Sequence, residues 1–182
     1  YGDWSSDVCS SDLGGGADVM VGAAGDDIYE VDDPADVVSE TSAAGIDTVE
    51  SVISYQLGSH LERLILTGND PINGLGNGLN NSIIGNAADN VLAGGSGRDV
   101  LTGSSGADCF RYAALTDSLL KGFDHISDLV IGLDRIDVPA GVSTQNLLQL
   151  GSVSSLAVPA LRKLLSATAL VADAAATFSL EG

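Results

Sequence analysis

A repeat of nine residues constrains the fold of this 182-residue chain more than any other feature. Residues 94–102 and 103–111 follow each other directly, and each has glycine first and fourth, Asp sixth and a large apolar residue eighth. Two further copies precede them at 76–84 and 85–93, with Asn in place of the Asp. Low-complexity sequence would not place an apolar residue two positions after each Asp or Asn. The chain is therefore predicted to stack short, equivalent units.

A second block of the same pattern opens near the N-terminus. Residues 14–21 and 22–30 follow the pattern, and Asp36 lies nine residues after Asp27, where the next repeat would place its acid. Residues 45–49 repeat the pattern again, two residues later than the period of nine predicts. The segment 49–75 between the blocks is an irregular insert. There, alternation from Val49 to Leu57 predicts one half-buried strand, and Leu61 to Leu66 predicts another.

Acidic residues are concentrated where the glycines are. Residues 14–138 hold 20 acidic and 5 basic residues together with 19 of the 23 glycines, in a chain of net charge -18. This coincidence suggests cation ligation, and the charge argues against binding nucleic acid or an anionic membrane. No uncharged apolar run is long enough to span a bilayer. A mean hydropathy of +0.25 argues against a disordered acidic tail.

The first thirteen residues are set apart from the fold. Residues 3–13 resemble one reading frame of a common sequencing adapter joined to a gene fragment, so 1–13 is interpreted as an artefact. A natural leader rich in Ser and Asp is the alternative. On the adapter interpretation a disulfide between Cys9 and Cys109 has no biological meaning, and Cys109 is a lone thiol.

The nonapeptide resembles the RTX, or haemolysin-type, calcium-binding repeat. The resemblance implies an all-β fold for residues 14–138, a parallel β-roll in which two nonapeptides form one coil. Loops 18 residues apart then lie on one edge and share calcium ions. The eighth residues would stack inward as a thin apolar core: Met20, Tyr29, Val38, Ile83, Leu92, Leu101 and Phe110.

The resemblance also implies a set of calcium ligands, because glycine turns aim carbonyl oxygens at the ion and Asp supplies the carboxylates that Ca²⁺ prefers. The set comprises Gly16, Asp18, Gly25, Asp27, Asp36, Asn81, Asn90, Gly94, Gly95, Gly97, Asp99, Gly103, Gly106, Asp108 and Asp117. Asn81 is expected below Asp99, Asn90 below Asp108, and Asp18 beside Asp36. Sites that include an Asn should bind more weakly, since they have one carboxylate fewer.

Residues 117–138 resemble the segment that closes many RTX rolls, including those of serralysin-type secreted peptidases. Ile126 and Ile136 should cap the core. Three acids, Asp124, Asp128 and Asp134, either ligate a terminal ion or form a solvated surface.

Residues 139–182 form a C-terminal extension, which looks truncated. Within it, residues 147–182 resemble the bluetail-type domain. Ser154 or Ser155 with Pro159 predicts a helix start there, so the extension is expected to be small and partly helical.

No enzyme signature is present: the sequence has no H-E-x-x-H, no G-x-S-x-G, no C-x-x-C and no P-loop. His60 and His125 are interpreted as surface or packing residues, and Cys109 is expected to point outward. The preferred interpretation is a non-catalytic calcium-binding module, covalently part of a larger secreted bacterial protein, that folds when it meets extracellular calcium. The alternative is the C-terminal domain of a secreted enzyme, such as a serralysin-like metallopeptidase, whose catalytic domain lies upstream.

Overall fold

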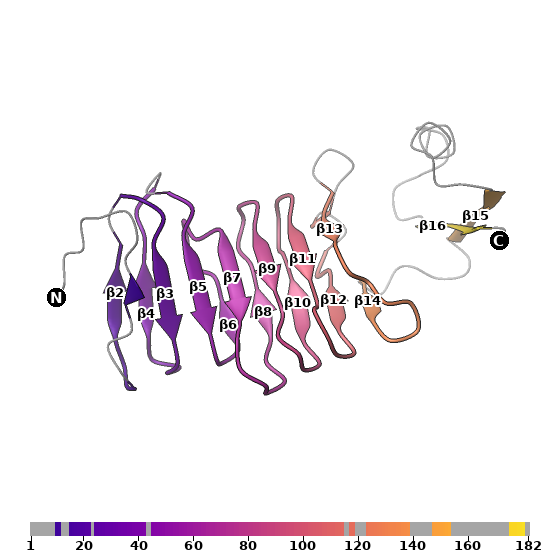
Figure 1. Ribbon diagram of the computed structural model, residues 1–182. Helices are drawn as coiled ribbons and strands as arrows, with labels where there is room; N and C mark the ends of the chain where they lie inside the picture. Colours follow the sequence, from indigo (N-terminus) through magenta and orange to yellow (C-terminus); the bar gives the residue numbers. More distant parts are fainter. Residues whose placement is uncertain are drawn as a thin grey trace. The chain divides into compact units, whose positions relative to one another are not determined.

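The computed structural model describes residues 10–11, 15–22, 24–42, 45–114, 117–118, 123–138, 147–153 and 175–180. Contacts divide the chain into two units, Tyr1–Asp137 and Val138–Gly182. All regular structure in the described residues is β-strand (Figure 1). Among these residues, none forms a helix with the length and hydropathy needed to cross a membrane.

The first unit is a parallel β-roll in which successive strands alternate between two sides (Figure 1). One side is a seven-stranded sheet made of β1 (Ser10–Ser11), β3 (Ile28–Val31), β5 (Thr48–Ser51), β7 (Arg63–Leu66), β9 (Ser82–Ile84), β11 (Val100–Thr102) and β13 (His125–Ile126). The other side holds a five-stranded sheet of β6 (Tyr55–Gln56), β8 (Gly74–Leu75), β10 (Val91–Ala93), β12 (Cys109–Arg111) and β14 (Arg135–Asp137), and a two-stranded sheet of β2 (Val19–Val21) and β4 (Val37–Ser39). The expected all-β parallel roll is confirmed.

The strand register follows the repeat. Val100 pairs with Ser82, and Cys109 pairs with Val91, so neighbouring strands of one sheet are one coil of two nonapeptides apart. Glycine makes the tight corners between strands possible. Gly95 and Gly97 have φ angles of 90° and 133°, a region that other residues rarely adopt.

The insert 49–75 continues the roll instead of interrupting it. β5 pairs with β7 and β7 with β9, so this segment supplies strands to both sheets. The single strand expected from Val49 to Leu57 is wrong, because the chain turns a corner after Ser51. There the backbone N–H of Ile53 donates to Ser51 Oγ at 3.2 Å, and Ser51 Oγ donates to the carbonyl of Ile53 at 2.9 Å.

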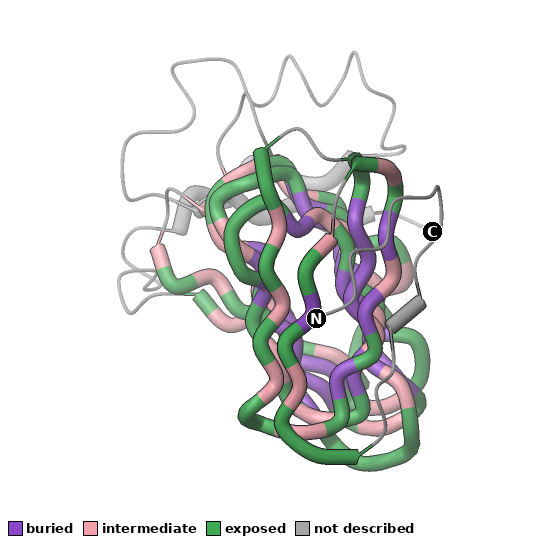
Figure 2. Tube along the Cα trace, turned by 90° about the vertical axis from the view of Figure 1, so that its left-hand side faces the viewer, coloured by how far each residue is buried: buried purple, intermediate pink, exposed green. Residues whose placement is uncertain are grey.

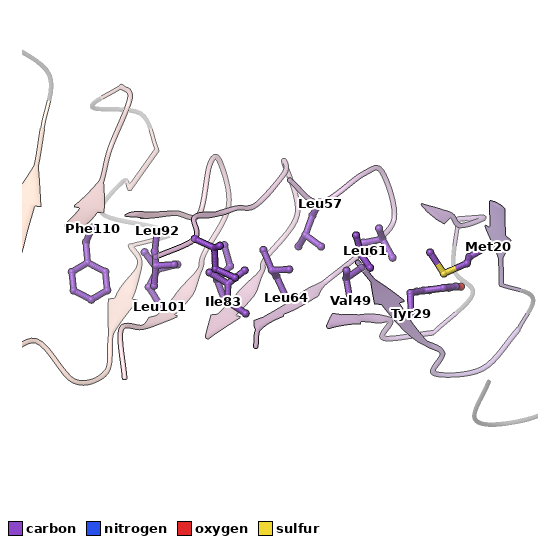
Figure 3. Packing of buried hydrophobic residues seen from close by; sticks show 13 residues of the cluster. Met20, Tyr29, Val49, Leu57, Leu61, Leu64, Ile83, Leu92, Leu101 and Phe110 are labelled. Carbon is purple, nitrogen blue, oxygen red and sulfur yellow. The ribbon is translucent and has the colours of Figure 1, made fainter. Parts of the chain in front are cut away.

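The core is one row of apolar side chains enclosed between the two sides (Figure 3). Buried residues alternate with more exposed ones along the chain (Figure 2). Six of the seven eighth-position residues are buried at 2% exposure or less, and the seventh, Val38, is partly buried against them. The predicted inward stack is therefore confirmed. The insert adds Val49, Leu57, Leu61, Leu64, Leu66 and Ile72 to the same row.

Two side chains differ from expectation. Cys109, predicted to point outward, is only 3% exposed. It lies on β12, which is paired on both sides, in register with Val91 and Arg135. Ile126 packs against the core as a cap, whereas Ile136, in register with Phe110, stays 50% exposed and covers the end less completely than expected. His60 and His125 are exposed.

The second unit contains two strands among its described residues. β15 (Leu147–Val153) and β16 (Ala175–Leu180) pair in parallel, with a register irregularity between Gln149 and Ser152. The helix start predicted near Pro159, and most of the adapter-like segment 1–13, lie outside the described residues.

Candidate metal sites

Polar side chains occupy the corners of the roll, about one per coil, in two rows. The first edge row precedes the strands of the seven-stranded sheet and consists of Asp27, Asp47, Glu62, Asn81, Asp99 and Asp124. The second edge row precedes strands of the opposite side and consists of Asp18, Asp36, Asn90, Asp108 and Asp134. These rows arise because the sixth position of every repeat falls just before a strand.

Within each row, hydrogen bonds join members on neighbouring coils. The backbone N–H of Asn81 donates to Asp99 Oδ1 at 2.8 Å, and that of Asn90 donates to Asp108 Oδ1 at 2.9 Å. The N–H of Asp18 donates in the same way to Asp36 Oδ1 at 2.9 Å. The structure therefore brings together the three stacked pairs that the repeat predicts.

At Asp36 both carboxylate oxygens are used, because Oδ2 accepts the backbone N–H groups of Asp32 and Asp33 at 3.1 and 3.0 Å. At Asp99 the bond within the row uses Oδ1 alone and leaves Oδ2 available. Asp99 is fully buried, and its Oδ2 has no hydrogen-bond partner; the same holds for Oδ2 of Asp27, which is 2% exposed. Burial raises the pKa of Asp99 to about 6, against the opposing bond from the Asn81 N–H, and the charges of Asp124 and Asp117 add to the rise. A buried, unpartnered oxygen of this kind is costly unless a cation compensates it.

The first glycine of each repeat makes room for the carboxylate. A Cβ on Gly94 would overlap Asp99 Oδ2, and a Cβ on Gly103 would overlap Asp108 Oδ2. The carboxylate thus folds back over its own loop. Burial also raises the pKa of Asp108, and the charges of Asp134, Asp128 and Asp89 contribute to the rise.

Near the N-terminus three carboxylates converge. One ligand oxygen each from Asp27, Glu40 and Asp47 lies within 4.8 Å of the others. The Tyr29 hydroxyl donates to Glu40 Oε1, and a Cβ on Gly22 would lie 2.8 Å from Asp27 Oδ2. Burial raises the pKa of Asp47, and the charges of Glu40, Asp27 and Asp26 raise it further. Oxygen ligands converging on a space left by glycine are suited to a hard cation.

Glu40, Asp47 and Glu62 were absent from the predicted ligand set. Glu40 occupies the first-glycine position, since Val21 pairs with Ser39 and the next residues are Gly22 and Glu40. A step of eighteen residues from Gly22 would have found it. Glu62 belongs to no repeat, and its Oε2 accepts the N–H of Asp47 at 3.0 Å.

The predicted terminal acids have structural partners. Asp128 accepts the backbone N–H groups of Gly103 and Ser104 at 2.9 and 2.7 Å. Asp134 accepts those of Asp108 and Val130 at 3.0 and 2.7 Å.

Two more acids lie near Asp99. Asp124 Oδ1 accepts the Asp99 N–H at 2.9 Å. Asp117 Oδ2 accepts the N–H of Ala114 at 2.8 Å, while the charge of Asp117 acts on both Asp99 and Asp124.

The corner loops, the stacked acids and the inward apolar row together define an RTX calcium-binding β-roll. Residues 12–29 match the family model of the RTX calcium-binding nonapeptide repeat (4 copies), and residues 43–165 match that of the peptidase M10 serralysin C-terminal region. The second match covers more than half of the chain, so the chain belongs to the serralysin C-terminal family.

A curated relative is an endo-1,3-1,4-beta-glycanase, EglC, of Rhizobium meliloti (strain 1021). The two are 39% identical over 64 residues, which are 35% of this chain and 14% of the glycanase. The chain thus spans a small part of that relative's length.

Proposed function

We propose that this chain is a calcium-binding module of a secreted bacterial protein and that calcium supplies much of the free energy that folds it. The observation that carries the proposal is Asp99 Oδ2, buried and without a partner at a corner of an RTX repeat. A bound Ca²⁺ would compensate that charge and draw further oxygens from the glycine loops. The converging carboxylates of Asp27, Glu40 and Asp47 support a second site.

The remaining predicted ligands, except Asn81 and Asn90, are assigned to the same role. On the second edge row these are Asp18, Asp36 and Asp108, with carbonyl oxygens from the loops that contain Gly16, Gly103 and Gly106. Asp117 contributes to the Asp99 site, since its charge acts there. The loop that contains Gly25 belongs to the Asp27 site, and the loop with Gly94, Gly95 and Gly97 belongs to that of Asp99.

A calorimetric titration with Ca²⁺ tests the assignment. The wild-type chain should show saturable binding with dissociation constants of roughly 10⁻⁴ to 10⁻³ M. Asp99→Asn should remove a site, because it takes away a buried carboxylate oxygen while keeping the shape. Asp89→Asn is the matched control, since Asp89 is an exposed acid of the neighbouring repeat whose Oδ1 accepts the Ala107 N–H at 2.7 Å. Equal losses in both variants, or equal binding of Mg²⁺, would contradict ligation by the edge rows.

Secretion is proposed together with the calcium dependence. RTX repeats and serralysin C-terminal domains are typical of secreted bacterial proteins. Each site filled at a hundredfold above its dissociation constant adds about 2.7 kcal/mol to the folded state. In a cytosol poor in Ca²⁺ the chain would lack this stabilisation and remain exportable; outside the cell it would gain it.

The parent protein is proposed to be larger than this chain. The family match and the partial match to a glycanase favour a C-terminal module attached to a secreted enzyme as the second candidate. The module itself is proposed to be non-catalytic. Assays of this chain on casein and on mixed-linkage glucan should show no hydrolysis, and the gene upstream of the segment should encode either a catalytic domain or further repeats.

A further inference from the structure

The middle of the roll differs from its two ends in the side chains that occupy the corners. Between β8 and β10 four asparagines, Asn77, Asn81, Asn86 and Asn90, stand where the next coil has Gly95, Asp99, Ser104 and Asp108. Three of them are almost fully buried, Asn81 at 2%, Asn86 at 6% and Asn90 at 1% exposure. A buried amide has to satisfy both a donor and an acceptor, whereas a carboxylate only accepts.

On the first edge row, two asparagines join their loop to the coil before it. Asn81 Oδ1 accepts the N–H of Asn77 at 2.8 Å, and Asn81 Nδ2 donates to the carbonyl of Leu61 at 3.1 Å. Asn77 Nδ2 donates to the carbonyls of Gly58 and Leu61 at 2.7 and 2.8 Å. Two amide groups therefore occupy the carbonyl oxygens of the loop that ends at Leu61.

The other side of the roll repeats this arrangement. Asn90 Oδ1 accepts the N–H of Asn86 at 2.9 Å, and Asn90 Nδ2 donates to the carbonyl of Ile72 at 2.6 Å. Asn86 Nδ2 donates to the carbonyls of Asp70 and Thr67 at 2.8 and 3.2 Å. The asparagines at the second and sixth positions therefore donate to carbonyls of the preceding coil on both edges, although Asn81 shares the Leu61 carbonyl with Asn77 while Asn90 bonds to Ile72.

These contacts are incompatible with a cation at the same place. An amide N–H₂ group and a Ca²⁺ ion both need the carbonyl oxygens between coils, and the amide brings hydrogen atoms where the ion would need lone pairs. The contrast with Asp27 and Asp99 is direct, because each of these keeps a buried oxygen without a partner.

We propose that the four asparagines take the place of calcium between the middle coils, so that residues 58–93 form an ion-independent centre flanked by two ends whose order depends on calcium. This inference rests on the proposed function for the ends. It changes the expectation for Asn81 and Asn90, which act as cross-links between coils and not as weak ligands.

Hydrogen exchange of the full chain, measured by mass spectrometry with and without calcium, tests the proposal. In calcium-depleted buffer, peptides from 58–93 should remain protected, while those from 15–42 and 123–137 should exchange quickly. With calcium, the ends should become protected and the centre should change little. Uniform protection, or uniform loss of it, in calcium-depleted buffer would overturn the proposal.

A pair of variants adds a test of the amides themselves. Asn81→Asp combined with Asn90→Asp keeps both acceptor oxygens but removes the donors to Leu61 and Ile72 and buries charge. Exchange in 58–93 should accelerate at least about tenfold in calcium-depleted buffer. Asn80→Asp is the control, since Asn80 is exposed and its Oδ1 accepts the Arg98 N–H at 2.9 Å, which a carboxylate also does.

The two proposals fail in different ways. An unchanged exchange rate in the double variant would defeat the role of the amides. Calorimetry that detects no calcium binding by the wild type would defeat the proposed function, whatever the exchange of the centre. Should the double variant not fold at all in calcium-depleted buffer, the exchange pattern of the wild type still decides between an ion-independent centre and a uniform roll.

Discussion

At the scale of single residues, the close approach of one coil to the next depends on glycine. Gly97 has a φ of 133°, and a Cβ at this position would overlap the carbonyl oxygen of Leu79 in the preceding coil. Gly78 lies in that preceding loop, yet nothing stands within 4 Å of its Cβ position. The two glycines therefore have different roles although both belong to repeat turns.

Replacing Gly97 by Ala is expected to destabilise the calcium-loaded chain by roughly 2–3 kcal/mol, because it adds backbone strain and a clash with Leu79. Gly78→Ala should change the stability by less than about 0.5 kcal/mol. Urea unfolding of both variants measures the difference. Similar losses of stability in both variants would mean that the repeat needs glycine for backbone flexibility and not for the close approach of neighbouring coils.

The residue pattern predicts the core and the stacked pairs, but not every polar contact. The nine-residue period was sufficient to predict that Met20 and Phe110 are buried and that Asn81 pairs with Asp99. Glu62 was missed because it belongs to no repeat, and Glu40 was missed because it stands at the first-glycine position, where the pattern predicts no ligand side chain. The burial of Cys109 was missed because the repeat predicts only which side of the strand its seventh residue faces, not how far that side is covered.

At the scale of an element, burial disfavours the charged forms of four acids in the edge rows. Burial raises the pKa of Asp99 to about 6 and raises those of Asp47, Asp108 and Asp124. Asp36 is the exception: burial raises its pKa, but the backbone N–H groups of Asp18, Asp33 and Asp32 together hold it below the ordinary value.

A raised carboxyl pKa in the folded state gives a definite sign to the pH dependence of the calcium-free chain. Protonation then favours the folded state, so the contribution of Asp99 is fully present below the unfolded pKa of about 3.9 and is lost as pH rises through about 6. Calcium-depleted protein should therefore melt at a higher temperature at pH 5 than at pH 7. The expected gain is on the order of 1–3 kcal/mol.

Asp99→Asn provides the control for this prediction, because its amide does not titrate. The variant should lose part of the difference between pH 5 and pH 7. With calcium present the trend should reverse, since protons compete with the ion for the same oxygens. A calcium-free wild type that melts lower at pH 5 would show that the buried row does not control the pH dependence.

The insert 49–75 shows how far a sequence pattern can predict the course of the strands. Alternation located the apolar residues of 49–57 correctly, but it did not reveal the corner after Ser51. The coils of the insert differ in length from 18 residues, so no fixed period could align Thr48 with Arg63 or Arg63 with Ser82. Their register depends on the apolar row and on contacts such as that of Ser82 N–H with the Glu62 carbonyl, at 2.8 Å.

At the scale of the whole molecule, the chain carries a net charge of -18, and most of the acids belong to the roll. Two effects then oppose folding without calcium: long-range repulsion between exposed acids, and the burial of Asp27 and Asp99 without a cation. Salt screens the first effect, because the Debye length falls to about 3 Å at 1 M, but it does not supply a ligand to a buried oxygen.

Screening and ligation should therefore be separable in a single melting experiment. In calcium-depleted buffer, raising KCl from 0.01 to 1 M should raise the melting temperature only in part, whereas about 10 mM CaCl₂ should raise it further despite its small ionic strength. MgCl₂ at the concentration used for CaCl₂ is the control, because Mg²⁺ screens equally but demands a smaller, octahedral shell. If KCl or MgCl₂ raised the melting temperature as far as CaCl₂ does, screening of diffuse charge would be enough to stabilise the roll. If only CaCl₂ gives the full rise in melting temperature, the buried oxygens of the edge rows select the ion.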